Sequence, residues 1–425
     1  MKNYVQKKLA SAARRLLAKR HPQIIAVTGS VGKSSTKQAI HAVLKRHGRV
    51  GVSPKNYNTE FGVPLSVLGL NMPASRWGWP WTLKLAVWRS FFPPAGYPDT
   101  LVLEMAADNP GDISYLCGIA RPDIAVITSV GESHLETFGT VENIDREKGS
   151  LLASMNPGGW ALLNRDDERV WAMRERTKTK VLSFGFHEAA DVRALPESVM
   201  INLDPAGVGE LDMKIAYRGS TVPMRLRGML GRPAVYAALA AAAVGIARGL
   251  NLVDIAEGLS SFESEPGRLR LLTGIKRTFL LDDTYNAAPR SATAALDTLR
   301  SLPLAESARR FAILGDMLEL GPVAVSGHED VGKHAAAAGL DFLVFVGELM
   351  GEAEKAALAA GFPRDRIFHF DAPQPAARFV QERLKQGDAV LVKGSRGMRM
   401  ERAVKELMAE PERARELLVA ADKDW

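Results

Sequence analysis

A stretch near the N-terminus combines glycines, a lysine and hydroxyl side chains at spacings that suit phosphate binding. It reads Thr28-Gly29-Ser30-Val31-Gly32-Lys33-Ser34-Ser35. The apolar residues 24–27 before it predict a buried strand, and residues 36–47 after it have helical spacing. In this context the loop N–H groups and the lysine bind phosphate oxygens, and the serine after the lysine ligates Mg²⁺. Val27 stands where the general pattern has a glycine, so the loop is a variant form, and it predicts a nucleoside triphosphate site.

Three further side chains of the same half could take part in phosphate chemistry. Glu104 ends a predicted strand at residues 100–104, His134 follows a second strand at 124–128, and Lys148 lies on the helix after it. Open parallel sheets bind ligands at such strand ends, and together with the phosphate loop these groups could complete a magnesium site. Taken alone, each is more readily interpreted as a surface acid, a loop histidine or a solvated lysine, so the prediction depends on their arrangement.

The order of predicted elements indicates an α/β protein with two units. Residues 23–265 read as a central, mostly parallel sheet of the P-loop type, with residues 178–226 alternating like antiparallel strands at its edge. Residues 266–425 alternate strands with helices, as in a Rossmann-like, doubly wound sheet. Its strands are expected at residues 279–281, 311–314, 342–346, 367–370 and 389–392.

Composition narrows the class of protein. A chain of 425 residues suggests two or three domains, and 46% hydrophobic with 24% charged residues is typical of globular proteins. The single cysteine, Cys117, excludes an internal disulfide and a cysteine-rich zinc site. No signal-peptide arrangement is present and the longest apolar run, residues 234–247, is too short to span a bilayer, so a cytoplasmic protein is expected.

The net charge of +7 is concentrated at the N-terminus. Residues 1–22 carry seven of the 55 basic residues and no acidic one, which leaves 48 basic residues to balance the 48 acidic ones. Apolar side chains recur on one helical face, and the set is Tyr4, Val5, Leu9, Ala13, Leu16 and Leu17. Such a helix either packs on the main unit with a solvated basic face or lies weakly on an anionic membrane. Nucleic acid is the least expected partner.

Residues 76–98 form an aromatic insertion in the first unit. They include four of the seven tryptophans, at positions 77, 79, 81 and 88, together with Phe91 and Phe92. The stretch is either a lid packed on the domain or an interfacial patch that faces lipid. Because it and residues 1–22 flank the phosphate loop in sequence, we expect the two segments to lie on one face.

Taken together, the motifs resemble the Mur ligase family of ATP-dependent amide-forming ligases, over residues 24–405. They are Thr28–Ser34, Asn56–Leu65, Leu103–Met105 with Asn109–Asp112, Ala120–Thr128, His134–Gly139, Asp282–Asn286, Leu314–Gly321 and Val392–Glu401. Only about 22 residues precede the loop strand, so the front domain with which many members grip a UDP group is not expected here.

The resemblance implies roles for individual residues. Lys33 would hold the γ-phosphate, and Ser34 with Glu104 would ligate one Mg²⁺. His134 and Lys148 would serve a second Mg²⁺, the lysine as its carbamate. In the second unit the implied nucleotide contacts are Asp283 at the ribose and Tyr285 beside the nucleotide, and the implied cations brought in by closure are Arg268 and Lys393.

The resemblance also implies a reaction. A carboxylate attacks the γ-phosphate of ATP, and an amine then displaces phosphate from the acyl phosphate. The branch of the family with the most similar motifs adds a D-alanyl-D-alanine dipeptide to a muramyl peptide in peptidoglycan synthesis. Two alternatives remain: a Mur-type ligase that joins another amine to another, lipid-linked carboxylate, and a nucleotide-binding scaffold without turnover.

Overall fold

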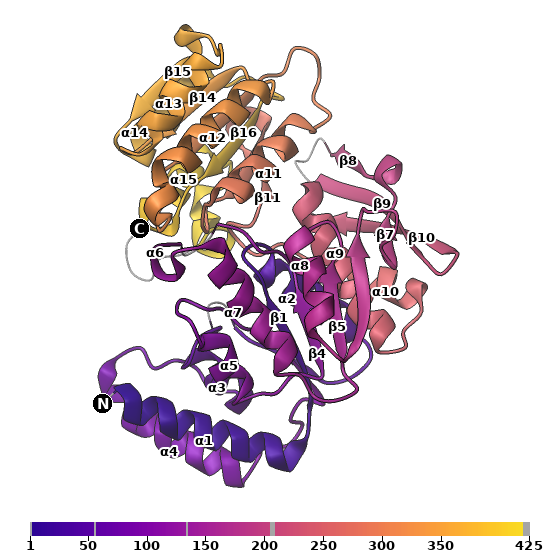
Figure 1. Ribbon diagram of the computed structural model, residues 1–425. Helices are drawn as coiled ribbons and strands as arrows, with labels where there is room; N and C mark the ends of the chain where they lie inside the picture. The colour runs from indigo at the N-terminus through magenta and orange to yellow at the C-terminus, as the bar shows by residue number, and fades with distance from the viewer. Residues whose placement is uncertain (1, 55–56, 133–134, 205–208, 420–425) are drawn as a thin grey trace.

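The computed structural model describes residues 2–54, 57–132, 135–204 and 209–419, which form two β-sheets covered by helices (Figure 1). In the first sheet the strand order is β10-β9-β7-β6-β5-β4-β1-β3-β2, with β8 paired to β9. Its strands are β1 (Gln23–Thr28), β2 (Val50–Val52), β3 (Thr100–Glu104), β4 (Ile124–Ile127), β5 (Trp160–Asn164), β6 (Lys180–Gly185), β7 (Val192–Ala194), β8 (Met200–Leu203), β9 (Gly209–Tyr217) and β10 (Ser220–Arg227).

Neighbouring strands from β2 to β7 run parallel, and β9 is antiparallel to β7, β8 and β10. The prediction of antiparallel strands over residues 178–226 is therefore right for β8 to β10 and wrong for β6. The reason is that α8 (Glu168–Ala172) and the turn after it carry the chain back across the sheet between β5 and β6, which makes that pair parallel.

Helices cover both faces of this sheet. The first residues of β1 alternate between the two cores, since Ile25 and Val27 pack on one side while Ile24 and Ala26 pack on the other. One face is covered by α2 (Lys33–Leu44), α9 (Gly231–Ala247) and α10 (Leu252–Leu259). The other face is covered by α3 (Gly62–Leu68), α5 (Asp112–Cys117), α6 (Leu135–Phe138), α7 (Val141–Ala153) and α8, together with α1 (Lys2–Arg20).

The second sheet has the order β11-β12-β16-β13-β14-β15. Its strands are β11 (Arg270–Gly274), β12 (Thr278–Asp283), β13 (Arg310–Gly315), β14 (Phe342–Val346), β15 (Ile367–Phe370) and β16 (Ala389–Lys393). Its helices are α11 (Pro289–Arg300), α12 (Ala324–Ala337) and α13 (Met350–Ala359) on one face, and α14 (Pro373–Arg383), α15 (Glu401–Leu407) and α16 (Ala414–Leu417) on the other. All its pairs are parallel except β11–β12, so the predicted α/β fold class is confirmed.

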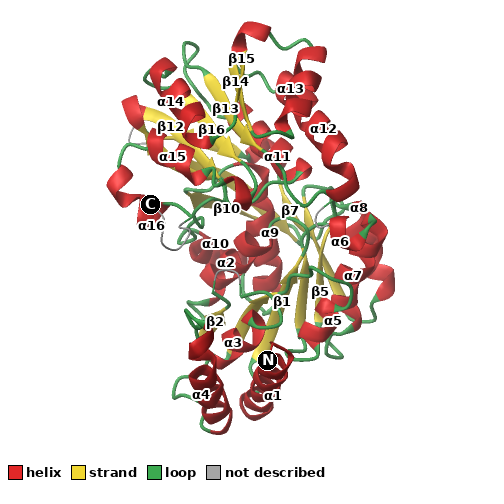
Figure 2. Ribbon diagram, turned by 90° about the vertical axis from the view of Figure 1, so that its left-hand side faces the viewer, coloured by secondary structure: helices red, strands yellow, loops and turns green. Residues whose placement is uncertain are grey.

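Helices α1 and α4 (Trp79–Phe91) lie side by side at the end of the molecule away from the second sheet (Figures 1 and 2). The expectation that the two segments share one face is confirmed. Leu9 and Leu16 of α1 are fully buried, whereas Tyr4 is 61% exposed, so Tyr4 was wrongly assigned to the apolar face. Its ring lies at the edge of that face, where Lys8 covers it from one turn further on.

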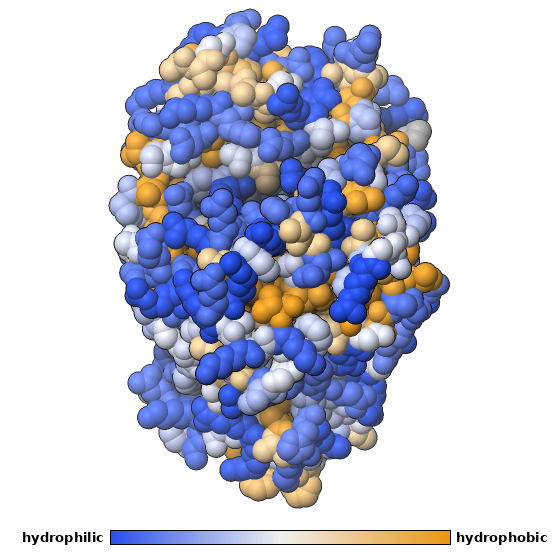
Figure 3. Space-filling view, turned by 45° about the vertical axis from the view of Figure 1, so that its right-hand side comes forward, coloured by the Kyte–Doolittle hydropathy of each residue, from blue (hydrophilic) through white to orange (hydrophobic). Residues whose placement is uncertain are grey.

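Among the described residues, no helix is both long and apolar enough to cross a bilayer. On the face shown in Figure 3, hydrophilic residues predominate and hydrophobic ones form small separate groups.

Candidate active site

The backbone of the phosphate loop connects β1 to α2 through two glycines with positive φ. At Gly29 (φ 147°) a Cβ would lie 2.0 Å from the Thr128 hydroxyl oxygen, so no side chain fits between the loop and the end of β4. Gly32 (φ 88°) precedes the first residue of α2 in the left-handed conformation that glycine adopts most easily. The two glycines therefore let the loop turn tightly, with the N-terminus of α2 behind it.

The loop is held in place by the residues that follow β4. The Ser30 N–H donates to the Ser129 carbonyl (2.8 Å), and the Val31 N–H donates to the Ser129 hydroxyl (3.0 Å). The Ser30 hydroxyl also bonds to the backbone of Gly131. These bonds therefore fix the conformation of the loop against the residues that follow β4.

Lys33 begins α2 and folds back over the loop. Its Nζ donates to the Gly29 carbonyl at 2.7 Å and to the Ser30 carbonyl at 3.4 Å. Burial lowers the pKa of Lys33, against the opposing effect of the nearby Glu104 carboxylate. The ammonium thus lies at the loop centre, where it can reach phosphate oxygens by a change of rotamer.

Glu104, the last residue of β3, is buried among cations and hydrogen-bond donors. Its Oε2 accepts from the Ser34 hydroxyl at 2.9 Å and lies 3.4 Å from Nζ of Lys37, while its Oε1 accepts from the Asn58 amide at 3.0 Å. Burial acts to raise the pKa of Glu104, but Lys37, Lys33 and Arg268 together hold this pKa below its ordinary value. Glu104 is therefore an ionised carboxylate beside the Ser34 hydroxyl, and two hard oxygen donors of this kind suit Mg²⁺.

Lys148 lies on α7, directly after Glu147, the residue whose side chain ties that helix to α5. The preceding residue, Glu147, accepts from the N–H groups of Gly111 and Ile113 at 2.7 Å each, which holds α7 against the start of α5. Lys148 is buried, and burial, followed by the charge of Lys33, lowers its pKa to about 7. The amine is therefore partly uncharged at neutral pH.

His134 lies outside the described residues. Within the part of the chain that the structure describes, no group of three His, Cys, Asp or Glu side chains is placed to hold a metal ion.

The second unit contributes Arg268 directly to the phosphate loop. One of its terminal nitrogens donates to the Ser34 hydroxyl at 3.2 Å, and its guanidinium stacks on the Tyr285 ring at 3.7 Å. Its Nε is buried and, among the described residues, has no hydrogen-bond partner. A buried guanidinium nitrogen without a partner beside a phosphate loop suits an anionic oxygen.

Asp283 and Lys393 end the adjacent strands β12 and β16, where they pair in register. The Lys393 ammonium donates to Asp283 at 2.6 Å and to the Asn286 carbonyl at 2.9 Å. The neighbouring Asp282 is fully buried, and burial raises its pKa to about 6 against the hydrogen bonds it accepts from Thr284 and Gly267. Asp282 thus fixes the turn that presents Arg268, and Asp283 faces the pocket.

One pocket brings together groups from both units, and Lys148 is not among the residues that line it. Its polar wall comprises the phosphate loop, Glu104, Arg268, Asp283 and Lys393. Its apolar wall is formed by Met229, Leu230, Pro233, Ala234, Ala287, Ala294 and Ala295. The polar part suits a triphosphate and the apolar part suits a flat base, so the pocket fits a nucleoside triphosphate.

Two family models match most of the chain. The Mur ligase middle domain matches residues 83–245, and the Mur ligase glutamate ligase domain matches residues 267–396. A UDP-N-acetylmuramoyl-tripeptide–D-alanyl-D-alanine ligase of Bacillus subtilis is 30% identical over 403 residues, which cover 95% of this chain and 79% of the relative. The chain belongs to the Mur ligase family.

Solved Mur ligases have the same architecture. MurF ligase from Thermotoga maritima in complex with ADP matches 96% of this chain and 84% of its own, with a TM-score of 0.79 and 29% identity. MurF from Acinetobacter baumannii matches 93% of this chain and 79% of its own, with a TM-score of 0.77 and 27% identity. A folylpolyglutamate synthase of Mycobacterium tuberculosis, at 18% identity and a TM-score of 0.64, shares the fold.

Three residues of this Mur ligase site escaped the sequence analysis. Lys37 lies one turn after Lys33, and the available signal was a second lysine on the same face of the helix. Asn58 was visible only as part of a motif. Asp108 lines the pocket, and its charge acts on both Lys33 and Lys148, although it follows β3 by four residues and no spacing marked it.

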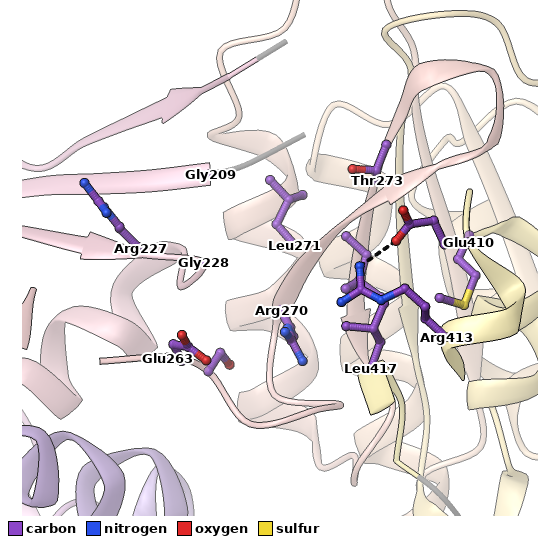
Figure 4. A pocket seen from close by; sticks show the side chains of 13 residues that line it. Gly209, Arg227, Gly228, Glu263, Arg270, Leu271, Thr273, Glu410, Arg413 and Leu417 are labelled. Carbon is purple, nitrogen blue, oxygen red and sulfur yellow. Dashed lines mark hydrogen bonds and ion pairs between the residues drawn. The ribbon is translucent and has the colours of Figure 1, made fainter. Parts of the chain in front are cut away.

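A second pocket lies between β9–β10 and the β11 edge of the second sheet (Figure 4). Its charged side chains come from Arg227, Glu263, Arg270, Glu410 and Arg413. Arg413 pairs with Glu410 across 2.7 Å. No residue of the phosphate loop lines this pocket, so it is separate from the nucleotide site.

Proposed function

We propose that this Mur ligase uses ATP to join the amine of D-alanyl-D-alanine to the carboxylate of a muramyl tripeptide, with release of ADP and phosphate. The observation that carries the proposal is the convergence of Glu104 and Arg268, one from each unit, on the Ser34 hydroxyl, in a pocket that Lys33 also lines. The Bacillus subtilis relative is named for this reaction, and the Thermotoga maritima structure contains ADP.

The charges explain how the pocket would serve two steps. A carboxylate oxygen of the first substrate attacks the γ-phosphorus, the bond to the β–γ bridging oxygen breaks, and ADP leaves. The amine nitrogen then attacks the acyl carbon, the acyl–oxygen bond breaks, phosphate leaves and the nitrogen loses a proton. Because carboxylate and triphosphate repel each other, Lys33 and Arg268 are needed to offset the negative charge. Closure of the second unit over the loop would protect the acyl phosphate from water.

The donors at the loop fit one Mg²⁺, for which Ser34 and Glu104 are the proposed ligands. The ion would supply additional neutralisation of the triphosphate charge. For a second Mg²⁺ the proposed ligands are His134, outside the described residues, and Lys148 as a carbamate. Asp283, Tyr285 and Lys393 are the proposed nucleotide contacts in the second unit, together with the loop residues 28–35.

A carbamate at Lys148 is supported by its burial and by its pKa of about 7. An uncharged amine nitrogen can attack CO₂ and lose its proton, which turns a poor metal ligand into an anionic oxygen donor. With ¹³CO₂ we expect a carbamate carbon signal in the NMR spectrum of the wild type that disappears in Lys148→Ala and persists in Lys178→Ala, an exposed control. Acetate should partly restore the activity of Lys148→Ala. A wild-type spectrum without the signal would contradict the carbamate and leave the ligase proposal intact.

The division of labour is part of the proposal. We assign residues 23–265 to the ATP-binding unit, residues 266–425 to the closing unit, and residues 1–22 to an added basic helix. The separate family matches at 83–245 and 267–396 support the division. We place the enzyme in the cytoplasm, with weak attachment to the inner face of the membrane.

Substrate-dependent ADP release tests the reaction. We expect release only when ATP, a UDP-linked muramyl tripeptide and D-alanyl-D-alanine are all present, and none when the carboxylate or the amine is omitted. Activity with another amine or carboxylate, and none with this pair, would support the alternative Mur-type ligase. ATP binding with no turnover on any pair would support the scaffold.

A further inference from the structure

The solvent face of α4 carries an aromatic stripe, defined as Trp77, Trp81, Trp88, Phe91 and Phe92. Their exposed fractions are 80%, 70%, 55%, 47% and 62% in that order. Trp77 belongs to the short helical turn η1 (Arg76–Gly78) that leads into α4, and the positions follow one another at helical spacing. The stripe is therefore a continuous face.

The solvent side of α4 is more aromatic than that of an ordinary surface helix. Its buried positions are Ala86 and Ser90, and Trp79, Leu83 and Leu85 pack partly buried against the core. Three large aromatic side chains of the same helix, Trp81, Trp88 and Phe91, are nevertheless exposed. Small residues let α4 pack closely against its neighbour, α1, and they leave the rings of the stripe largely exposed to water on the other side of the helix. An exposed apolar patch of this kind marks a contact surface.

Cations surround the stripe. Arg15 lies 4.3 Å and Lys19 5.4 Å from the centre of the Phe91 ring, and Lys84 lies 5.3 Å from the Trp81 ring. The Lys19 ammonium also donates to the Phe91 carbonyl at 3.0 Å, which ties the two helices together. Neither residues 2–22 nor residues 61–98 contain an aspartate or glutamate. The two segments thus combine exposed aromatic rings with basic side chains, and one acid from outside them, Glu60, pairs with Lys2 at the start of α1 at 3.3 Å.

We propose that this α1–α4 surface docks on a bilayer that contains anionic phospholipid. Tryptophan and phenylalanine would sit at the level of the headgroups, and the lysine and arginine heads would meet lipid phosphates. The charge selects a lipid surface over a second copy of this chain, since two copies of a predominantly basic face repel each other. Both helices lie at the end of the molecule opposite the second sheet, so docking there leaves the closing unit free to move (Figures 1 and 2).

The proposed membrane attachment thereby gains a defined surface and a defined lipid chemistry. It rests on the proposed function in one respect, the location of the enzyme in the cytoplasm.

Point variants test it better than removal of residues 1–20, because Leu9 and Leu16 of α1 are core residues and the truncated chain would not keep its fold. The aromatic variant is Trp81→Ser with Trp88→Ser, and the charge variant is Lys8→Glu with Lys84→Glu, all at exposed positions. Matched controls are Val253→Ser, an exposed apolar position on α10, and Lys178→Glu.

The measurement is co-sedimentation of the full chain with vesicles of phosphatidylcholine alone or with phosphatidylglycerol added. We expect about tenfold more binding to the anionic vesicles, a loss of about fivefold or more in each test variant, and no change in the controls. Equal binding to both vesicles, or binding that survives both variants, would overturn the proposal. The proposal would also be overturned if light scattering showed that the wild type is a dimer and the aromatic variant a monomer, because a second copy would then cover the stripe. ADP release by the same preparations in solution reports separately on the ligase reaction.

Discussion

The nucleotide pocket and the α1–α4 surface differ in whether their charged and apolar side chains are buried or exposed. In the pocket, Glu104 and Lys37 are almost fully buried and compensate each other at 3.4 Å. On the α1–α4 surface Arg15, Lys19 and Lys84 are exposed, and each lies over an aromatic ring that is itself exposed. The pocket is complete within the folded chain, whereas the surface keeps its binding groups in water.

The difference shows what burial indicates about a binding group. A buried charged side chain has its partner within the same folded chain, whereas an exposed aromatic or basic side chain is available to a partner outside it. Burying a charged side chain without a partner would cost several kcal/mol of folding free energy. The buried Glu104 carboxylate is therefore stable only because the fold brings cations next to it. Exposed tryptophan costs the folded state little, since the same ring is also hydrated in the unfolded chain. A site for a small charged ligand can therefore be recognised by its buried, paired charges. A docking surface can be recognised by apolar surface that remains exposed after folding.

The largest expected effect is at the centre of the pocket. Lys33→Ala removes the cation of the phosphate loop, and we expect ADP release to fall by about 10³-fold while the thermal transition stays near that of the wild type. The control is Lys45→Ala, which lies past the end of the same helix and is exposed. Near-normal turnover by Lys33→Ala would contradict the proposal that this pocket binds the triphosphate.

Lys37→Met tests whether the buried pair holds the pocket together. We expect the free energy of unfolding to fall by about 3–5 kcal/mol, because Glu104 loses a buried cation 3.4 Å away. The pKa of Glu104 is held below its ordinary value, so its stabilising contribution is present above the unfolded-state pKa and is lost as pH falls through the folded-state pKa. Without Lys37 acid unfolding should begin at higher pH, as measured by circular dichroism, and Lys45→Met should leave it unchanged.

Lys148→Met should separate stability from activity. The folded-state pKa of about 7 lies below the value for an unfolded lysine, so between these values the unfolded chain binds a proton that the native protein does not. In buffer free of CO₂, where Lys148 is an amine, stability should therefore rise with pH above 7 in the wild type, and the rise should be smaller in Lys148→Met. At pH 7 the variant should be more stable than the wild type, because it removes an amine whose burial disfavours the charged form, yet inactive. A less stable variant would show that the amine makes a favourable contact.

The smallest effect is expected on the α1–α4 surface. Trp81→Ala should change the free energy of unfolding by less than about 0.5 kcal/mol and ADP release in solution by less than about twofold, because the ring is 70% exposed. Denaturant titration and the ADP assay measure these changes. A loss above about 1.5 kcal/mol would mean that the ring packs in the fold, and the contrast between the two regions would disappear.

The sequence by itself determined the local parts of this protein. Residues 24–35 specify a strand, a glycine turn and a helix start because those preferences act between neighbours, and the strands of the second sheet follow from alternation of apolar runs with helices. The predicted positions of Glu104 and Lys148 on their elements also depend on local pattern alone.

Only the tertiary structure decided which of these parts meet. Arg268 reaches Ser34 across 234 positions of sequence, and Lys37 reaches Glu104 because α2 packs beside β3. Likewise the aromatic content of residues 76–98 was plain in the sequence, but whether the rings face the core or water depends on which side of α4 packs against α1. Burial and pairing are properties of the assembled layers, since a side chain acquires its surroundings from elements that the sequence does not place next to it.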